Sequence, residues 1–397
     1  MLIDPPNYPG HGRLWAHLAS DASFEELHRF AEALGIPQRG FDRDHYDIPA
    51  ERYDAVLAAG ATPVSSRELI ARLTAAGLRR RKAETPVPRR PGRPLLRPPR
   101  LRRGDTAAVA APAGPVPGER LDAGLAVLRS WGLVVREMDH VRGRYQRLDY
   151  LAASDAERVS DLTRAWCDPE VRAVVCARGG YGAQRVVDLL DWEVLADAGP
   201  KVLVGFSDVT ALHQAFAARL GLVTVHGPVV TSLGEADPAT REHLRTLLFA
   251  PTAGMSLTPE PAHRLVGGRA EGVLAGGNLA LLATEMGTPH ARPATGAIVV
   301  LEDICEEPYR LDRMLTQLLR AGWFDGVRGI VLGRFTDCGP PEQVAEVLRD
   351  RLVPLGVPIV CDVPVGHEQH NLACPFGVPA VLDADSGTLV LAEAPLR

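Results

Sequence analysis

The chain has 397 residues, of which 46% are hydrophobic and 23% charged, and its formal net charge is −5. These values are typical of a globular protein, and the length predicts two or three domains rather than one core. No apolar run reaches the length of a membrane span, and the amino terminus has no basic and apolar leader. We therefore expect a cytoplasmic protein with no membrane partner.

The six cysteines are scattered along the chain and never form a C-x-x-C pair. This spacing argues against a structural zinc site and against a disulfide framework. We interpret the cysteines as small core residues, and the sequence indicates no cofactor.

A basic, proline-rich stretch divides the chain. Between Arg79 and Arg103 there are eleven Lys or Arg residues, one acid and six prolines. Proline removes backbone donors and like charges repel, so we expect residues 83–100 to form an extended, mobile linker. The stretch could instead touch nucleic acid or another anionic surface. A solvated linker is the simpler interpretation, and we expect no nucleic-acid partner.

Residues 1–82 form the first expected domain, a small α/β domain. They resemble a small bacterial domain of unknown function, and the resemblance is carried by Asp4-Pro-Pro, residues 11–17, Ser20-Asp21 and residues 41–47. The resemblance implies no activity for this part of the chain.

Some residues of this first domain have side chains that bind metals. His17 and Asp21 stand four residues apart on an expected helix, and His45 lies in an expected loop with three acids, Asp42, Asp44 and Asp47. Such a set could bind a divalent metal. The alternative is that these side chains cap helices and form salt bridges with Arg13, Arg39 and Arg43.

From residue 101 onward, short apolar runs alternate with helical patterns. The expected strands are residues 105–111, 133–137, 172–177, 201–205 and 222–226. The expected helices are residues 118–131, 183–190 and 209–219, and one that opens with a capping box at Ser154 and Glu157. Repeated strand–helix units predict a mostly parallel sheet with helices on both faces, which we assign to residues 101–240.

Residues 241–268 are polar, contain proline and glycine, and are expected to connect this domain to a second one. In residues 269–397 the expected strands are 297–301, 329–333 and 358–362, and helices are expected after Asn278 and over 309–321. The sequence thus predicts an α/β protein. Its mostly parallel central domain is followed by a second, smaller α/β domain and preceded by the small amino-terminal one.

Ser207 follows an apolar run that ends at Gly205, where the next helix begins. In an α/β enzyme, a hydroxyl at the carboxyl end of a strand is placed as a nucleophile, and neighbouring amides point at the same spot. Serine is also a good helix N-cap, which is the alternative role. Val209 replaces the second glycine of G-x-S-x-G, so the turn is not the common hydrolase elbow.

The turn Arg178-Gly-Gly-Tyr-Gly182 also follows an expected strand. It is either a simple tight turn or a backbone that a ligand can approach without meeting a Cβ atom. Neither G-x-G-x-x-G nor a Walker lysine is present, which disfavours phosphate binding. An oxyanion hole fits better, with one amide from this turn and one from Asp208.

A serine nucleophile needs a base and an acid that orients the base. His367 follows a strand end and a glycine, and His226, which also ends a strand, is the rival base. We interpret His213, inside the helix that follows the serine, as a packing residue. Glu302 ends a strand and could orient an imidazole. Spacing alone does not exclude the neighbouring acids Asp303, Glu306 and Glu307.

Together these motifs are similar to those of the LD-carboxypeptidase family of serine peptidases, which also includes the microcin-C self-immunity peptidases. The resemblance covers about residues 101–397 in a single order. It is carried by residues 178–182, 205–208, 276–278, 301–303, 307–313, 333–335 and 366–367.

The resemblance implies a Ser–His–Glu triad, in which Ser207 is the nucleophile, His367 is the general base and acid, and Glu302 orients the imidazole. It implies an oxyanion hole from backbone amides of Gly180 and Asp208. It also implies a cytoplasmic homodimer that needs no metal, with the serine on one domain and the other two triad residues on a smaller carboxy-terminal domain.

The implied substrate is a muropeptide, cut during peptidoglycan recycling between the L-centre of meso-diaminopimelate and the terminal D-alanine of a tetrapeptide. A free carboxylate favours arginine. Arg178 is the candidate, with Gly179 and Tyr181 beside it, although Arg178 could equally form a structural ion pair. The alternatives are an immunity-type peptidase that cleaves peptidyl-nucleotide conjugates and a binding protein in which Ser207 only caps its helix.

Overall fold

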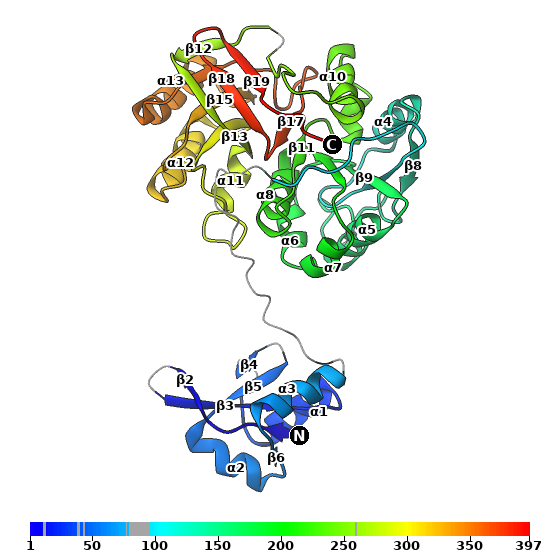
Figure 1. The fold of residues 1–397 in the computed structure, drawn as a ribbon, viewed down its shortest axis with the longest axis vertical. Coiled ribbons are helices and arrows are strands. Elements are labelled where there is room, and N and C mark those ends of the chain that lie inside the picture. Colours follow the sequence, from blue (N-terminus) through cyan, green and yellow to red (C-terminus); the bar gives the residue numbers. More distant parts are fainter. Residues whose placement is uncertain (11–12, 38–39, 43, 77, 79–94, 259) are drawn as a thin grey trace. The chain divides into compact units, whose positions relative to one another are not determined.

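The computed structural model describes all 397 residues except 11–12, 38–39, 43, 77, 79–94 and 259. The chain forms two compact units, Met1–Thr85 and Pro86–Arg397, which are described separately below (Figure 1). Among the helices of the described residues, none is both long enough and apolar enough to cross a membrane.

The amino-terminal unit is a small α/β domain, as the sequence predicted. Its sheet has the strand order β4-β5-β3-β1-β6, and β2 also pairs with β3. The strands are β1 (Leu2–Ile3), β2 (Tyr8–Gly10), β3 (Arg13–Ala19), β4 (Phe41–Asp42), β5 (His45–Pro49) and β6 (Thr62–Pro63). The helices are α1 (Phe24–Ala33), α2 (Tyr53–Ala58), α3 (Ser66–Ala75) and the 3₁₀ turn η2 (Ala50–Arg52). Leu18, Leu27 and Ile48 are fully buried in its core.

Two local predictions for this unit are wrong. Residues 17–21, expected on a helix, include the end of strand β3, and residues 42–47, expected in a loop, belong largely to the β4–β5 hairpin. In β3, Leu18 is buried and His17 is only partly buried, which is the two-residue period of a strand. The sheet therefore determines the conformation of these segments.

The first part of the body is built on a mostly parallel sheet of order β17-β11-β10-β9-β7-β8. Its strands are β7 (Thr106–Ala110), β8 (Val134–Glu137), β9 (Val171–Cys176), β10 (Val202–Gly205), β11 (Thr224–His226) and β17 (Cys374–Phe376). Its helices are α4 (Gly118–Ser130), α5 (Asp155–Cys167), α6 (Ala183–Val187), α7 (Trp192–Asp197), η3 (Ser207–Val209), α8 (Thr210–Arg219), α9 (Val230–Leu233) and α10 (Pro238–Phe249). The predicted strand–helix alternation is confirmed, and so is the capping box of Ser154 and Glu157.

The second part of the body has a mixed sheet of order β12-β16-β15-β14-β13-β18-β19, in which β13 to β16 are parallel. Its strands are β12 (His263–Val266), β13 (Arg269–Asn278), β14 (Ala297–Ile304), β15 (Gly329–Thr336), β16 (Ile359–Cys361), β18 (Pro379–Asp383) and β19 (Thr388–Leu391). Its helices are α11 (Leu279–Thr284), α12 (Pro308–Arg320), α13 (Pro341–Leu352) and η4 (Val353–Leu355). The predicted second α/β domain is thus present.

The two parts of the body are interleaved more closely than the expected boundaries imply. Helix α10 extends well into the expected connection 241–268, yet its Leu244, Leu247 and Leu248 lie in the core of the first sheet. From the same connection, β12 pairs with β16 of the second sheet. Strand β17, from the carboxy-terminal region, pairs with β11 of the first sheet. The leucine spacing on α10 explains why this segment is a packed helix and not a simple connection.

The end of the expected linker 83–100 belongs to the body. Leu95 is only 6% exposed, and its N–H donates to the Gly377 carbonyl at 3.0 Å. The next N–H, that of Leu96, donates to Gly221 at 2.7 Å. This end is therefore packed against the body and is not part of a solvated linker, because an apolar side chain is buried there. Residues 83–94 lie outside the described residues.

Candidate active site

Ser207 lies in a sharp turn between β10 and the short helix η3. Its φ angle is +65°, a left-handed conformation that costs a non-glycine residue about 1–3 kcal/mol. Gly205 makes the turn possible, because a Cβ atom there would lie 2.8 Å from Val209 Cγ1. Ser207 is the first residue of η3, and its side chain does not cap that helix. The helix-cap interpretation of Ser207 is therefore wrong.

The double-glycine turn after β9 lies directly against Ser207. A Cβ atom on Gly179 would lie 2.9 Å from Ser207 Cβ and 3.1 Å from its Oγ. The Gly179 carbonyl accepts a hydrogen bond from Gly114 N at 3.1 Å, which holds the turn. Gly180 has a φ angle of +102°, and its N–H donates to no other described residue. The turn therefore brings a free backbone donor close to the serine.

Asp208, the residue after the serine, ties the two turns together. Its buried carboxylate accepts a hydrogen bond from Ala183 N at 2.7 Å, at the start of helix α6. Burial raises the pKa of Asp208 to about 6, although backbone hydrogen bonds and the Arg158 guanidinium favour its ionised form. The Asp208 side chain thus supports the turn, which leaves only its backbone N–H for an oxyanion.

Arg158 on α5 holds the glycine-rich turn through hydrogen bonds, a role that was not predicted from the sequence. It is 1% exposed and donates to the Gly182 carbonyl at 2.8 Å and to the Ala153 carbonyl at 3.2 Å. It also donates to the Pro112 carbonyl and to the Asp155 carboxylate. In the sequence, Arg158 stands on the same helix face as Leu162 and Ala165, and an arginine on an apolar face is the signal that could have indicated this role.

His367 and Glu302 form a buried pair in the second domain. Glu302 Oε2 accepts a hydrogen bond from His367 Nδ1 at 2.8 Å, and Glu302 is completely buried. Because Nδ1 carries the proton in this bond, Nε2 of the imidazole is left as the basic nitrogen. The His367 ring lies 4.8 Å from the ring of Phe206, the residue before Ser207. The pair thus lies next to the serine turn.

The backbone around Glu302 explains two glycines of the sequence motifs. Between Leu301 and Asp303 the pairing of β14 with β15 shifts by one residue. Two residues of β15, Gly333 and Arg334, therefore lie opposite one residue of β14, Glu302. This irregularity is a β-bulge, which changes the direction in which a side chain points. A Cβ atom on Gly333 would lie 2.4 Å from the Val365 carbonyl, and one on Gly366 would lie 3.1 Å from Glu302 Oε2.

The three neighbouring acids make other contacts. Asp303 accepts hydrogen bonds from Asn278 Nδ2, Ala280 N and Ile304 N at 2.8, 2.9 and 2.8 Å. Glu306 pairs with Arg310 at 3.5 Å on the surface, and Glu307 takes the N-cap position of α12. Of the four acids in this region, Glu302 is therefore the one bonded to His367.

The two other histidines of the first sheet are buried packing residues. His213 Nε2 donates to the Gly205 carbonyl at 2.8 Å, behind the serine turn, and burial lowers its pKa to about 4. His226 is completely buried, and burial holds its pKa well below the usual value. Both imidazoles are neutral at pH 7, and neither ring faces solvent, where a substrate would arrive.

Thr210 joins the two domains beside the serine turn. Its Oγ1 accepts a hydrogen bond from Asn278 N at 3.0 Å, where β13 ends and α11 begins. A Cβ atom on Gly277 would lie 2.6 Å from Thr210 Oγ1, so only glycine permits this approach. Asn278 in turn caps α11 and donates to Asp303. This contact fixes the second domain against the start of helix α8.

The expected substrate-binding residues surround the glycine-rich turn. Arg178 is partly buried, and its Nη1 donates to the Pro115 carbonyl at 2.7 Å. Tyr181 is 48% exposed and contacts Tyr150 edge to face, with 5.8 Å between the ring centroids. Arg178 forms no ion pair with a described acid. The alternative that Arg178 forms a structural ion pair is therefore not supported within the described residues.

In the amino-terminal unit, the structure separates the three expected metal-binding residues. Asp21 pairs with Arg72 on α3, with 2.6 Å between Oδ2 and Nη2, whereas His17 and His45 lie together on β3 and β5. The grouping with Asp21 is wrong, because β3 is a strand and not a helix. Arg39 and Arg43, two of the expected salt-bridge partners, lie outside the described residues.

Models of known families match most of the chain. The LD-carboxypeptidase N-terminal domain matches residues 107–227, and the LD-carboxypeptidase C-terminal domain matches residues 271–382. Residues 1–76 match a family described as a protein of unknown function (DUF4031). Ser207 thus lies in the first matched peptidase domain, and Glu302 and His367 lie in the second.

Known relatives are similar over almost their whole length. A relative in Streptomyces coelicolor is 58% identical over 301 residues, which are 75% of this chain and 97% of the relative. The murein tetrapeptide carboxypeptidase of Pseudomonas aeruginosa is 38% identical over 290 residues, 70% of this chain and 93% of that protein. The solved muramoyltetrapeptide carboxypeptidase of Oxalobacter formigenes is 31% identical, with a TM-score of 0.64, over 72% of this chain and 97% of that one.

Proposed function

Because this chain belongs to the LD-carboxypeptidase family, and is therefore a serine-type carboxypeptidase, we propose that Ser207, His367 and Glu302 are its catalytic triad. The observation that carries the proposal is the 2.8 Å bond between Glu302 and His367 beside a serine at positive φ. Glu302 keeps the proton on Nδ1, so that Nε2 can accept the serine proton.

In the proposed reaction, Ser207 Oγ attacks the scissile carbonyl while His367 Nε2 takes the hydroxyl proton. The backbone N–H groups of Gly180 and Asp208 donate to the developing oxyanion. His367 then passes its proton to the leaving amine, and water hydrolyses the acyl-enzyme by the same route. In the described residues, Ser207 Oγ makes no hydrogen bond to His367, and we expect that bond to form in the substrate complex.

The proposed substrate is a murein tetrapeptide, from which the enzyme releases terminal D-alanine by cleaving an L,D-peptide bond. Support comes from the relatives named as murein tetrapeptide and muramoyltetrapeptide carboxypeptidases. Arg178, beside the proposed oxyanion hole, is the proposed partner of the free carboxylate. Cytoplasmic recycling of muropeptides by a homodimer completes the proposal.

The test is release of D-alanine from a purified tetrapeptide by the wild type and by Ser207→Ala. We expect kcat of the variant to fall by about 10⁴-fold or more. Ser386→Ala, on an exposed hairpin of the second domain, is the matched control and should keep full activity. A wild type that releases no D-alanine would contradict the proposal. Cleavage of a peptidyl-nucleotide conjugate instead would favour the immunity-type reaction.

A further inference from the structure

Three side chains of the amino-terminal unit converge on one face of its sheet. In the antiparallel pairing of β3 with β5, His17 lies directly opposite Asp47. His45 is two residues before Asp47 on the same strand, so its side chain points to the same face. The neighbouring residues Leu18 and Ile48 point into the core. The strand period therefore gathers two imidazoles and one carboxylate on the sheet face opposite to that of Leu18 and Ile48.

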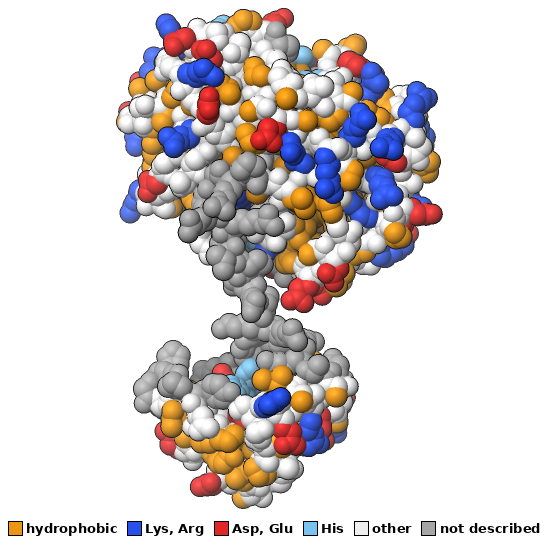
Figure 2. Space-filling view, in the orientation of Figure 1, with side chains coloured by type: hydrophobic (Ala, Val, Ile, Leu, Met, Phe, Trp, Pro, Cys, Tyr) orange, Lys and Arg blue, Asp and Glu red, His pale blue; other side chains and the backbone are white. Residues whose placement is uncertain are grey.

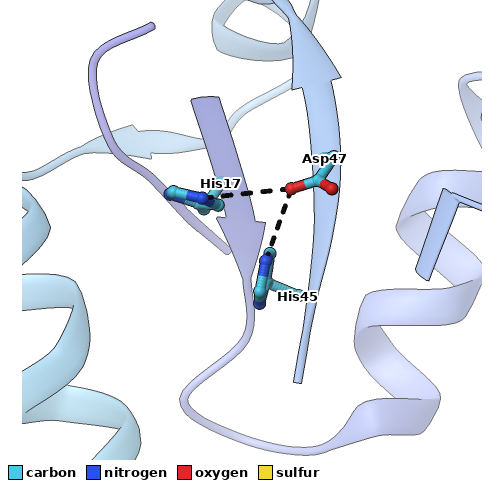
Figure 3. Close-up of side chains that lie close together, drawn as sticks. All are labelled: His17, His45 and Asp47. Atoms are coloured by element: carbon cyan, nitrogen blue, oxygen red, sulfur yellow. Dashed lines mark ion pairs between the residues drawn. The ribbon is translucent and has the colours of Figure 1, made fainter. Parts of the chain in front are cut away.

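The ring nitrogen that faces Asp47 is Nε2 in both histidines (Figure 3). Asp47 Oδ1 lies 3.4 Å from His45 Nε2 and 3.9 Å from His17 Nε2. The three atoms all lie within 4.8 Å of one another. Ligand atoms around a tetrahedral zinc ion are about 3.3 Å apart, because each metal–ligand bond is about 2.0 Å. Small side-chain movements would thus place all three atoms at bonding distance from one ion.

Each imidazole is held from behind by its own buried carboxylate. His17 Nδ1 contacts Asp4 Oδ2 at 3.0 Å, and His45 Nδ1 contacts Asp44 Oδ1 at 2.7 Å. Asp4 and Asp44 are each 1% exposed. Asp4 also accepts a hydrogen bond from the His17 N–H at 2.6 Å. Because these carboxylates can hold a proton on Nδ1, Nε2, which faces Asp47, is the nitrogen of each ring that can release its proton and bind an ion.

Paired carboxylates behind two converging histidines are the usual support of metal-binding imidazoles. A simple ion pair with Asp47 would need only one histidine and no second buried acid. The site reaches solvent, since Asp47 is 45% exposed and His17 and His45 are 22% and 14% exposed; histidine surface is visible on this unit (Figure 2). An ion can therefore enter, and water can occupy its remaining positions.

From this geometry we propose that His17, His45 and Asp47 bind a divalent first-row transition-metal ion. Two imidazole nitrogens and one carboxylate suit zinc, manganese or iron, whereas calcium and magnesium prefer sets made wholly of oxygen. Three protein ligands leave at least one position for water or another ligand, as in catalytic metal sites. The site is independent of the proposed peptidase function, because its residues all belong to the other compact unit.

The experiment titrates the full-length, chelator-treated protein with Zn²⁺ and with Mn²⁺ by calorimetry. We expect one ion per chain for at least one of the two metals. Asp47→Asn keeps the shape of a half-exposed side chain, and it should weaken binding by at least about 100-fold, as should His45→Ala. His28→Ala is the control, because His28 in the same unit bonds the Tyr46 hydroxyl and should not affect binding.

Cobalt provides a second measurement, because a thiolate ligand adds an intense charge-transfer band that nitrogen and oxygen ligands lack. We expect visible Co²⁺ absorption without that band, and its loss in Asp47→Asn. Absence of saturable binding for both metals would overturn the proposal. Equal affinity in Asp47→Asn and the wild type, or a thiolate band that places the ion on a cysteine, would overturn it as well.

Discussion

Adjacent residues of the candidate active site have different surroundings, although the sequence makes them look alike. Glu302 and Asp303 follow each other at the end of β14, and successive strand side chains point to opposite faces. Glu302 therefore reaches His367, while Asp303 reaches Asn278 and the start of α11. Both acids satisfy the spacing of a triad, so the sequence left them as alternatives. Only the direction of each side chain distinguishes them.

Replacing the charge of Glu302 tests its proposed role. In Glu302→Gln the amide can still contact His367 Nδ1, but it no longer holds the proton there or stabilises the imidazolium. We expect kcat for D-alanine release to fall by about 10³- to 10⁴-fold with a smaller change in KM. Glu306→Gln alters only a surface pair with Arg310 and should leave kcat unchanged. Equal losses in the two variants would argue against Glu302 as the orienting acid.

Asp303 should make the stability of the protein depend on pH. Burial and the neighbouring Glu302 charge raise the pKa of Asp303 to about 7 from 3.8. Between these two pH values the folded state then binds more protons than the unfolded state. The contribution of this carboxyl to the free energy of unfolding is therefore lost as the pH rises from about 4 to 7.

Asp303→Asn removes this titration. Because the wild type is penalised by the buried charge only at high pH, the loss of stability in the variant should be larger at pH 5 than at pH 8. Thermal unfolding of both proteins at the two pH values measures the difference. An equal loss at both values would show that Asp303 does not titrate in this range.

At the scale of elements, the site depends on turns that glycine permits. The turn of residues 178–182 presses against Ser207, and the bulge opposite Glu302 needs Gly333. The sequence indicated both positions, since residues 178–182 follow an expected strand and Gly333 ends another. It did not indicate the reason at Gly333, because the bulge exists only once β15 lies beside β14. A glycine in the sequence thus indicates that other atoms approach the backbone closely at that position. Only the tertiary structure shows which atoms these are.

Gly179→Ala tests the contact between the turn and the nucleophile. The φ angle of Gly179 is not positive, so alanine fits the backbone, but its Cβ would meet Ser207 at 2.9 Å. A shift of the serine should lower kcat by about 10²-fold while the melting temperature changes little. Gly118→Ala is the control, because a Cβ atom there meets nothing within 4 Å. Full activity in Gly179→Ala would show that the turn tolerates displacement.

At the scale of the whole molecule, the proposed triad is divided between two domains that share strands and helices. Strand β17 returns to the first sheet, and the Thr210–Asn278 contact fixes the domains beside Ser207. The amino-terminal unit has a core of its own. About three quarters of this chain accounts for nearly the full length of the Streptomyces coelicolor relative. The carboxypeptidase fold therefore needs no counterpart to the remaining quarter.

Removing Met1–Thr85 should separate the two proposed sites. The proposed triad and oxyanion hole lie wholly within Pro86–Arg397, so we expect unchanged kcat and KM for D-alanine release. The truncated chain should lose the metal binding attributed to His17, His45 and Asp47. Parallel activity and calorimetric measurements on the two chains provide the test. Loss of activity in a folded, truncated chain would show that the first unit takes part in the reaction.

The sequence by itself determined the α/β class and the strand–helix order of the body, and it placed Ser207, Glu302 and His367 among the candidate site residues. These features follow from local periodicity and from glycine positions. Only the tertiary structure decided that Glu302 bonds His367, that Asp21 pairs with Arg72, and that Asp47 joins the two histidines. The reason is that strand order and register bring these residues together, and neither is encoded in the local pattern of the chain.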